Sequence, residues 1–166
     1  MNALDILKYG HLTVVSTVKG LPEDQWETPN VCGWWSSKNI IAHLASFELV
    51  LVEILSTFIE DVPAPTLKKF GESPQGFNDE SVAERQHLRP AETWAEYEKT
   101  QARAMELMAE IPVEVRRQKG RLPWYGLEYD LEDFVVYTFY GHKREHMAQI
   151  YVFLDLLTSR GQEEIK

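Results

Sequence analysis

The sequence predicts an all-α protein: an antiparallel four-helix bundle with long connecting loops, forming one domain over residues 1–166. Apolar residues recur at helical spacing along most of the chain, and the alternation that is typical of strands is almost absent. Hydrophobic residues make up 44% of the chain and five residues are tryptophan, which favours a packed globule over a disordered chain. A chain of 166 residues can bury one hydrophobic core without disulfides.

Capping residues mark the first two helices. We expect the first helix to cover residues 3–19, with Asn2 as its N-cap and a glycine directly after its end. The proline- and glycine-containing stretch that follows cannot continue that helix. The second helix then begins at Ser36 or Ser37, either of which can cap it, and continues to about Glu60 with a broad apolar face.

The middle of the chain alternates between a loop and helices. Residues 61–77 contain several prolines and glycines, and this composition predicts a loop. A short helix is expected over residues 79–88. Pro90 suits the first position of a third long helix, which we expect to reach about residue 111, because proline needs no backbone N–H partner there.

The last helix follows a second long connection, residues 112–129. Asp130 and Asp133 have the spacing of a capping box, so this helix is expected over residues 131–159. Four amphipathic helices joined in this way indicate an antiparallel bundle. Its two long connections are expected to carry structure of their own or to line a site.

Charge and composition exclude several classes of partner. The net charge is −9, and the only dense basic stretch, residues 116–121, lies in an expected loop and is interpreted as a solvated connector. We therefore expect no nucleic-acid partner, since phosphate backbones are bound by clustered Lys and Arg. No apolar run approaches the ~20 residues of a membrane span, and no secretory signal is recognised. The single cysteine, Cys32, suits a reducing compartment, so we expect a cytoplasmic protein without a membrane partner.

Two histidines in the last helix are the sharpest chemical feature. His142 and His146 are four residues apart, so both rings project from one face of a helix and can reach one ion. They lie on an otherwise apolar stripe, which predicts that they face the interior of the bundle. Two buried imidazoles need partners, and a shared metal ion satisfies both. Two alternatives remain open: a hydrogen-bonded pair of core histidines, or a helix rotated so that both meet solvent.

His43 adds a third candidate ligand. It lies on the inner side of the second helix, and metal sites in bundles are assembled from inward side chains on facing helices. A lone histidine on an apolar face is more often a core residue than a ligand. If His43, His142 and His146 converge, three imidazoles with positions left open to water match a catalytic metal site rather than a structural one.

Two segments resemble patterns of the DinB-like (YfiT-like) superfamily. WSSKNIIAHLASFE (35–48) resembles its Trp-Ser-x-Lys-x-x-x-x-His-Leu-x-x-x-Glu pattern, and GHKREHMAQI (141–150) its closing His-x-x-x-His-x-x-Gln-Ile pattern. The resemblance implies a four-helix bundle that binds a divalent ion, often nickel or zinc, through one histidine of the second helix and two of the last. Those positions are His43, His142 and His146. PWYG (123–126) also resembles a colibactin-resistance-like branch of the superfamily.

Further residues are candidates for a substrate pocket: His11, Trp35, Glu48, Trp124, Tyr125 and Gln149. His11 is either a core histidine or a fourth ligand or proton shuttle. Glu48 is turned away from His43, and is either a surface charge or a carboxylate that orients a ligand. Gln149 can contact a ligand or support helix packing. The loop aromatics Trp124 and Tyr125 favour a substrate wall or lid, and the loop around Trp35 is expected to shape the same pocket.

Two enzymatic functions follow from such a metal site. One is hydrolysis of an electrophilic small molecule; the other, which the resemblance also implies, is a thiol-dependent transferase or isomerase reaction with a low-molecular-weight thiol. The alternative is a non-catalytic protein that sequesters a small molecule, with a structural or incidental metal. Fold alone does not decide between these functions. A homodimer formed through an outer face of the bundle is also left open.

Overall fold

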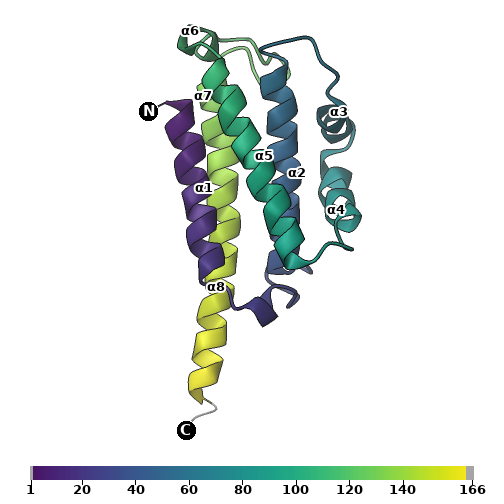
Figure 1. Ribbon diagram of the computed structural model, residues 1–166, viewed down its shortest axis with the longest axis vertical. Coiled ribbons are helices and arrows are strands. Elements are labelled where there is room, and N and C mark those ends of the chain that lie inside the picture. Colours follow the sequence, from purple (N-terminus) through teal and green to yellow (C-terminus); the bar gives the residue numbers. More distant parts are fainter. Residues whose placement is uncertain (1, 164–166) are drawn as a thin grey trace.

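The protein is built almost entirely from helices (Figure 1). The computed structural model describes residues 2–163, and over that range it contains no strand beyond an isolated bridge between Cys32 and Trp35. The predicted all-α bundle with long connections is confirmed. Its long helices are α1 (Ala3–Lys19), α2 (Ser37–Ser56), α5 (Pro90–Glu110) and α8 (Gly141–Glu163).

Two helices of the bundle run each way, but successive helices do not simply alternate in direction (Figure 1). α1 and α8 run down the bundle in the view of Figure 1, whereas α2 and α5 both run up. The core clusters agree, because the C-terminal halves of α2 and α5 share one cluster and their N-terminal halves share the other. The long connection between α2 and α5 returns the chain to the end at which α2 began, and this is why α2 and α5 are parallel neighbours. α1 and α8 form a second parallel pair, and the two pairs are antiparallel to each other.

That connection contains two helices, α3 (Pro65–Glu72) and α4 (Pro74–Glu84), which pack on the outer face of α2. The expectation of a loop over 61–77 is therefore wrong, since residues 65–72 and 74–77 are helical, whereas the short helix expected over 79–88 is present but covers Pro74–Glu84. Each of the two prolines stands at the first position of its helix, where a fixed φ and a missing N–H are tolerated. Phe70 and Phe77 then bury one side of the connection against α2.

Helix ends agree closely with their capping residues. Asn2 accepts a hydrogen bond from the backbone N–H of Asp5 (2.9 Å), and Gly20 follows the last residue of α1, as predicted. α5 begins at Pro90, also as predicted. α2 ends at Ser56 instead of continuing to about Glu60, and a turn takes over directly after it.

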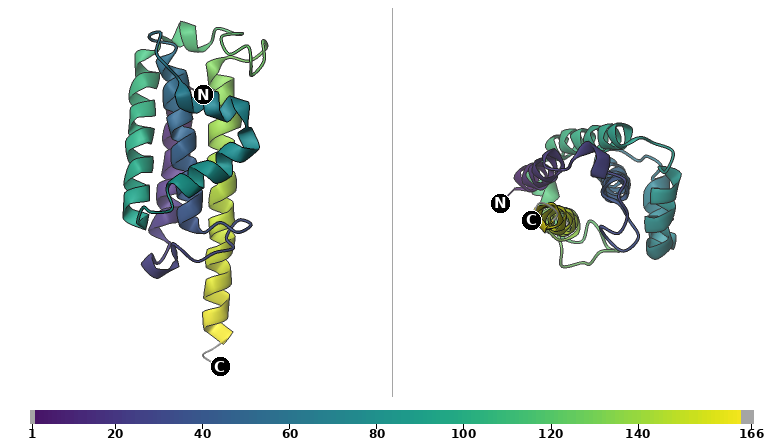
Figure 2. Two further views of the ribbon diagram at one scale, coloured as in Figure 1. Left: turned by 90° about the vertical axis from the view of Figure 1, so that its right-hand side faces the viewer. Right: turned by 90° about the horizontal axis from the view of Figure 1, so that it is seen from below.

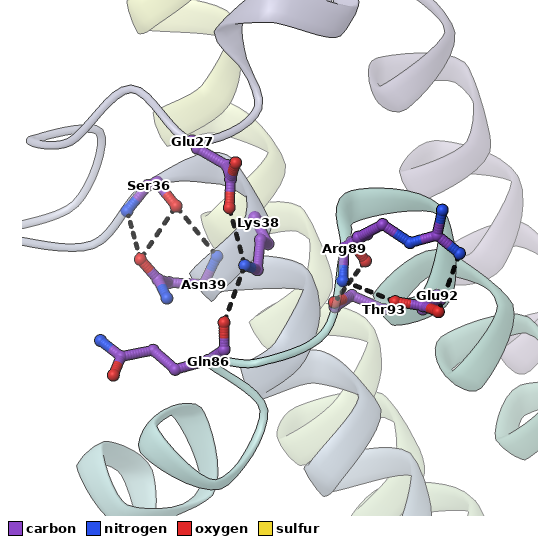
Figure 3. Close-up of polar contacts among 8 residues, drawn as sticks. All are labelled: Glu27, Ser36, Lys38, Asn39, Gln86, Arg89, Glu92 and Thr93. Carbon is purple, nitrogen blue, oxygen red and sulfur yellow. Dashed lines mark hydrogen bonds and ion pairs between the residues drawn. The ribbon is translucent and has the colours of Figure 1, made fainter.

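Figure 3 shows how the start of α2 is held. Ser36 caps the helix: its Oγ accepts from the N–H of Asn39 (3.2 Å), and Asn39 Oδ1 accepts from the N–H of Ser36 (3.0 Å). Lys38 is nearly buried, and its Nζ donates to Glu27 Oε1 (2.7 Å) and to the carbonyl of Gln86 (3.2 Å). These contacts fix the start of α2 against the loop before it and the segment that leads into α5.

The connection before the last helix is also partly ordered. It contains one helical turn, α6 (Val113–Arg116). Arg116 is buried, and its Nε donates to the carbonyl of Ile111 (2.7 Å). The interpretation of residues 116–121 as a solvated connector is therefore wrong at Arg116, which stabilises the turn after α5 instead of meeting solvent.

The last helix has three parts. α7 (Leu131–Phe134) begins with the predicted capping box between Asp130 and Asp133. A π-helical segment, Val135–Tyr140, follows and leads directly into α8, which continues past the predicted end to Glu163. A π-helical segment places more residues in each turn than an α-helix, and such segments are frequent beside functional sites. The side chains after Tyr140 therefore point in directions that a continuous α-helix would not give.

The helices form a ring that is loosely closed between α2 and α8. Seen along the bundle (Figure 2, right), α8, α1, α5 and α2 follow one another, with α3 and α4 outside α2. α2 and α8 have the least extensive backbone contact of these neighbours. Side chains must therefore bridge α2 and α8.

α2 is long and apolar enough to cross a membrane by length and composition, but 67% of its most apolar window is buried, as in the core helix of a soluble protein.

Gly10 permits the close approach of α1 and α8. A Cβ at Gly10 would lie 3.4 Å from both Lys143 Cδ and Tyr140 Cδ2, so nothing larger than a methyl group fits. We expect Gly10→Leu to lower the free energy of unfolding by about 1–3 kcal/mol through overpacking, measured by urea denaturation. Gly71→Leu is the matched control, because a Cβ there meets no atom within 4 Å and leucine is the better helix former. Equal destabilisation of both variants would contradict this account.

Candidate metal centre

Three imidazoles meet between α2 and α8. His43 comes from the second turn of α2, and His142 and His146 lie one turn apart at the start of α8. His142 Nε2 is 2.9 Å from His43 Nε2 and 2.9 Å from His146 Nε2. No two of the three ligand atoms are more than 4.8 Å apart. The rings of His43 and His146 are 2% and 7% exposed, and His142 is partly exposed, so the cluster opens toward solvent mainly at His142.

Hydrogen bonds alone do not satisfy this cluster. A nitrogen of a neutral imidazole carries either one hydrogen or one lone pair, so His142 Nε2 can make one in-line hydrogen bond, not two. His146 Nδ1 lies 2.8 Å from Gln149 Oε1, an acceptor, which places the hydrogen of His146 on Nδ1 and leaves the Nε2 lone pair free. Whichever neighbour His142 pairs with, its contact with the other lacks a hydrogen bond. A cation at the centre of the three nitrogens satisfies all of them.

Gln149 orients one ligand, whereas His43 lacks such a partner. The bond between Gln149 and His146 is the type of outer contact that fixes the tautomer of a metal-binding histidine. His43 Nδ1 is buried and has no hydrogen-bond partner among the described residues. The ring of His43 is instead held by packing, with Trp35 at 4.8 Å and Phe47 at 4.7 Å between ring centroids. Trp35 therefore packs against the imidazoles, and its part in shaping a substrate pocket stays a prediction.

Burial keeps the three imidazoles neutral. Desolvation, followed by the neighbouring imidazoles, lowers the pKa of His43 to about 2. Desolvation, followed by His146 and Lys143, lowers the pKa of His142 to about 3. Desolvation also lowers the pKa of His146. Neutral imidazoles present their lone pairs, which is the form that binds a metal ion.

Beside the histidines lies a buried ion pair, Glu48 with Lys143. Glu48 Oε1 is 2.7 Å from Lys143 Nζ, and the two side chains are 1% and 2% exposed. The interpretation of Glu48 as a surface charge is wrong; its carboxylate crosses from α2 to α8 to meet Lys143. The sequence did contain a signal for Lys143, which lies four residues after Phe139 and four before Met147, both buried on the same stripe. Sequence reasoning passed over it because lysine is almost never fully buried.

The remaining candidate pocket residues lie away from the three histidines. His11 Nδ1 is 3.3 Å from the hydroxyl of Tyr97, and His11 is not among the converging ligands. It is thus a packed histidine between α1 and α5, in agreement with the core-histidine interpretation, and it does not join the three ligands. Trp124 and Tyr125 pack against Phe134 near the start of the last helix, with ring centroids 5.6 Å and 4.8 Å away. Neither touches the imidazoles.

Glu48→Gln tests the buried pair. The amide leaves the Lys143 ammonium buried without a counter-charge, so we expect the free energy of unfolding to fall by about 3–5 kcal/mol. The double variant Glu48→Leu/Lys143→Met removes both charges and should recover most of that loss. Glu106→Gln, in the exposed pair with Arg103, is the control and should change stability by less than about 1 kcal/mol. A Glu48→Gln protein as stable as the Glu106→Gln control would refute the bridge.

The lowered pKa values predict how the metal-free protein responds to pH. Below pH ~6.5 the unfolded chain takes up protons on His43 and His142, whereas the folded chain does not, so stability must decrease as pH falls. Each of these histidines adds a slope of up to about 1.4 kcal/mol per pH unit between their unfolded and folded pKa values. Chemical denaturation from pH 7 to pH 4 measures the slope. His43→Leu should make it shallower, and an unchanged slope in that variant would contradict the assignment.

Comparison with known proteins places the chain in a family. A family model described as the mycothiol maleylpyruvate isomerase N-terminal domain matches residues 11–129, a stretch that contains His43 and ends before His142. No curated protein and no solved structure gives a significant match. The model covers well over half of the 166 residues. The chain therefore belongs to the family of the mycothiol maleylpyruvate isomerase N-terminal domain, within the DinB-like superfamily.

Proposed function

We propose that His43, His142 and His146 bind a divalent metal ion, nickel or zinc, and that the protein is a metal-dependent enzyme acting on a small electrophile with a low-molecular-weight thiol. One observation carries the proposal: three imidazole nitrogens from two helices, two of them on buried residues, lie within 4.8 Å of one another and cannot all be hydrogen-bonded to one another. We propose that the three histidines converge in this way because together they bind one metal ion.

The distances suit a metal. With bonds of about 2.1 Å to imidazole nitrogen, neighbouring ligand atoms lie about 3.0 Å apart in octahedral geometry and about 3.4 Å apart in tetrahedral geometry. Two contacts between ligand nitrogens here are both 2.9 Å, close to the octahedral spacing. The third pair lies within 4.8 Å, so His43 and His146 would move toward each other when three adjacent positions are filled. Three protein ligands leave coordination positions open, which is the property that separates catalytic from structural metal sites.

The surrounding residues define the chemistry available. When bound, a divalent metal supplies Lewis acidity that lowers the pKa of a thiol or water toward neutrality. Trp35 and Phe47 wall the imidazoles with aromatic rings and so limit access of water. The only cluster of potential ligands among the described residues is purely histidine, and the nearby Glu48 is paired with Lys143. Among the described residues, Glu48 is therefore not free to act as a general base, which favours activation by the metal.

The family supports a thiol as the second reactant. Its members are metal-binding, thiol-related domains, and the name of the family includes the thiol mycothiol. We therefore prefer a thiol-dependent transferase or isomerase reaction on an electrophile to hydrolysis. The alternative is a non-catalytic protein that sequesters the same kind of molecule, and the experiments below separate the two.

Metal content is the first test. Protein purified without a histidine tag should contain about one nickel or zinc ion per chain by elemental analysis, and His146→Ala should lose it. His87→Ala is the matched control, since His87 is exposed and outside the cluster. Gln149→Leu should keep the ligands but weaken metal affinity about 10–100-fold, as expected for loss of a contact that orients a ligand. Equal metal content in the His146→Ala and His87→Ala proteins would remove the basis of the proposal.

Turnover is the second test. The metal-loaded protein should accelerate loss of free thiol in the presence of an electrophile, and His146→Ala should abolish this while keeping the helical circular dichroism signal. Ligand affinity that survives in His146→Ala, without turnover in any variant, would favour sequestration. Collapse of the helical signal on chelation would instead identify the metal as structural.

A further inference from the structure

A small apolar cavity lies between α3 and the connection that carries Trp124. It has a volume of about 220 Å³ and is lined by Leu67, Phe70, Gly71 and Trp124. Almost all of its surface is apolar, in contrast to the other cavities among the described residues, whose linings are of mixed polarity. Trp124, in the wall of this cavity, is 54% exposed.

The cavity connects to the histidines through two aromatic rings. Phe70, in the cavity wall, lies 5.5 Å from Phe47 between ring centroids. Phe47 in turn lies 4.6 Å from His142 and 4.7 Å from His43. Both phenylalanines are only partly buried. Two ring-to-ring contacts thus separate the cavity wall from the ligand cluster, a span within the length of one small molecule.

The size of the cavity limits what it holds. An apolar cavity of about 150 Å³ in another protein binds benzene, so about 220 Å³ accommodates one substituted aromatic ring or an aliphatic group of similar bulk. It is too small for a helix or a polypeptide segment with several side chains. Gly71 contributes to this space, because a Cβ at that position meets no atom within 4 Å.

We infer that this cavity binds the apolar part of the substrate, a single aromatic ring or a comparable group, while the electrophilic end of the same molecule lies at the histidines. The inference rests on the proposed function and adds a substrate class to it. The substrate is an electrophile with a ring-sized apolar group, and the Phe47 side chain lies between that group and the reacting carbon. Phe70 and Trp124 are then specificity-determining residues. They contact the apolar group and take no part in the chemistry.

Fluorobenzene is a direct probe of the cavity. Its fluorine NMR signal should broaden and shift on addition of the metal-free protein. Gly71→Leu, which fills the cavity, and Trp124→Ala, which removes a wall, should each weaken binding about tenfold or more. Trp34→Ala is the matched control, since Trp34 is 53% exposed and lies outside the cavity, and it should bind like the parent. No binding by the parent, or unchanged binding by Gly71→Leu, overturns the inference.

A second measurement tests the link to the histidines. Paramagnetic cobalt at the three imidazoles should strongly increase the relaxation of bound fluorobenzene, whereas diamagnetic zinc should not. Relaxation that is the same with both metals, in protein shown to contain them, would mean that the cavity does not serve this centre and would overturn the inference. A protein that binds fluorobenzene but takes up neither metal would refute the proposed function and the assignment of the cavity to its substrate, and would leave a ring-binding cavity established.

Discussion

The approach of α2 to α8 is the constraint on which the candidate site depends. The two helices have little direct backbone contact, and buried polar side chains bridge them: three imidazoles, and the ion pair of Glu48 with Lys143. Buried polar groups of this kind are stable only when each finds its partner. Polar contacts therefore help to set the spacing between α2 and α8, beside the apolar side chains that the two helices share in the core.

The rest of the fold supports that spacing from outside. Apolar cores at both ends of the bundle hold α1, α2, α5 and the last helix together. The Ser36 cap and the hydrogen bonds of Lys38 fix where α2 begins. α3 and α4 cover the outer face of α2, so Phe47 is held between Phe70, Phe77 and the imidazoles. The site thus lies on helices, with connecting segments only at its margins, an arrangement suited to holding ligands in fixed geometry.

Local sequence signals predicted much of this structure, whereas features that depend on contacts between distant residues were mostly missed. Asn2, Pro90 and Asp130 act on their own neighbours, so the helix starts that they mark were predictable. The meeting of His43 with His142 and His146 was anticipated because an inward stripe limits where a side chain can point. Lys143 was missed, since its burial depends on Glu48, far away in sequence. The helices at Pro65 and Pro74 were missed because the same residues that end one helix begin another, and only packing on α2 distinguishes the two.

The π-helical segment Val135–Tyr140 determines in which direction the histidines of α8 point. It inserts about one residue into the turns before His142, and an α-helix rotates by about 100° for each residue. Shortening the segment by one residue would thus swing His142 and His146 about a quarter of a turn around the helix axis, away from α2. Residues before His142 thus determine the direction in which both histidines point. Deletion of one residue there would disable the centre while leaving every histidine in the sequence.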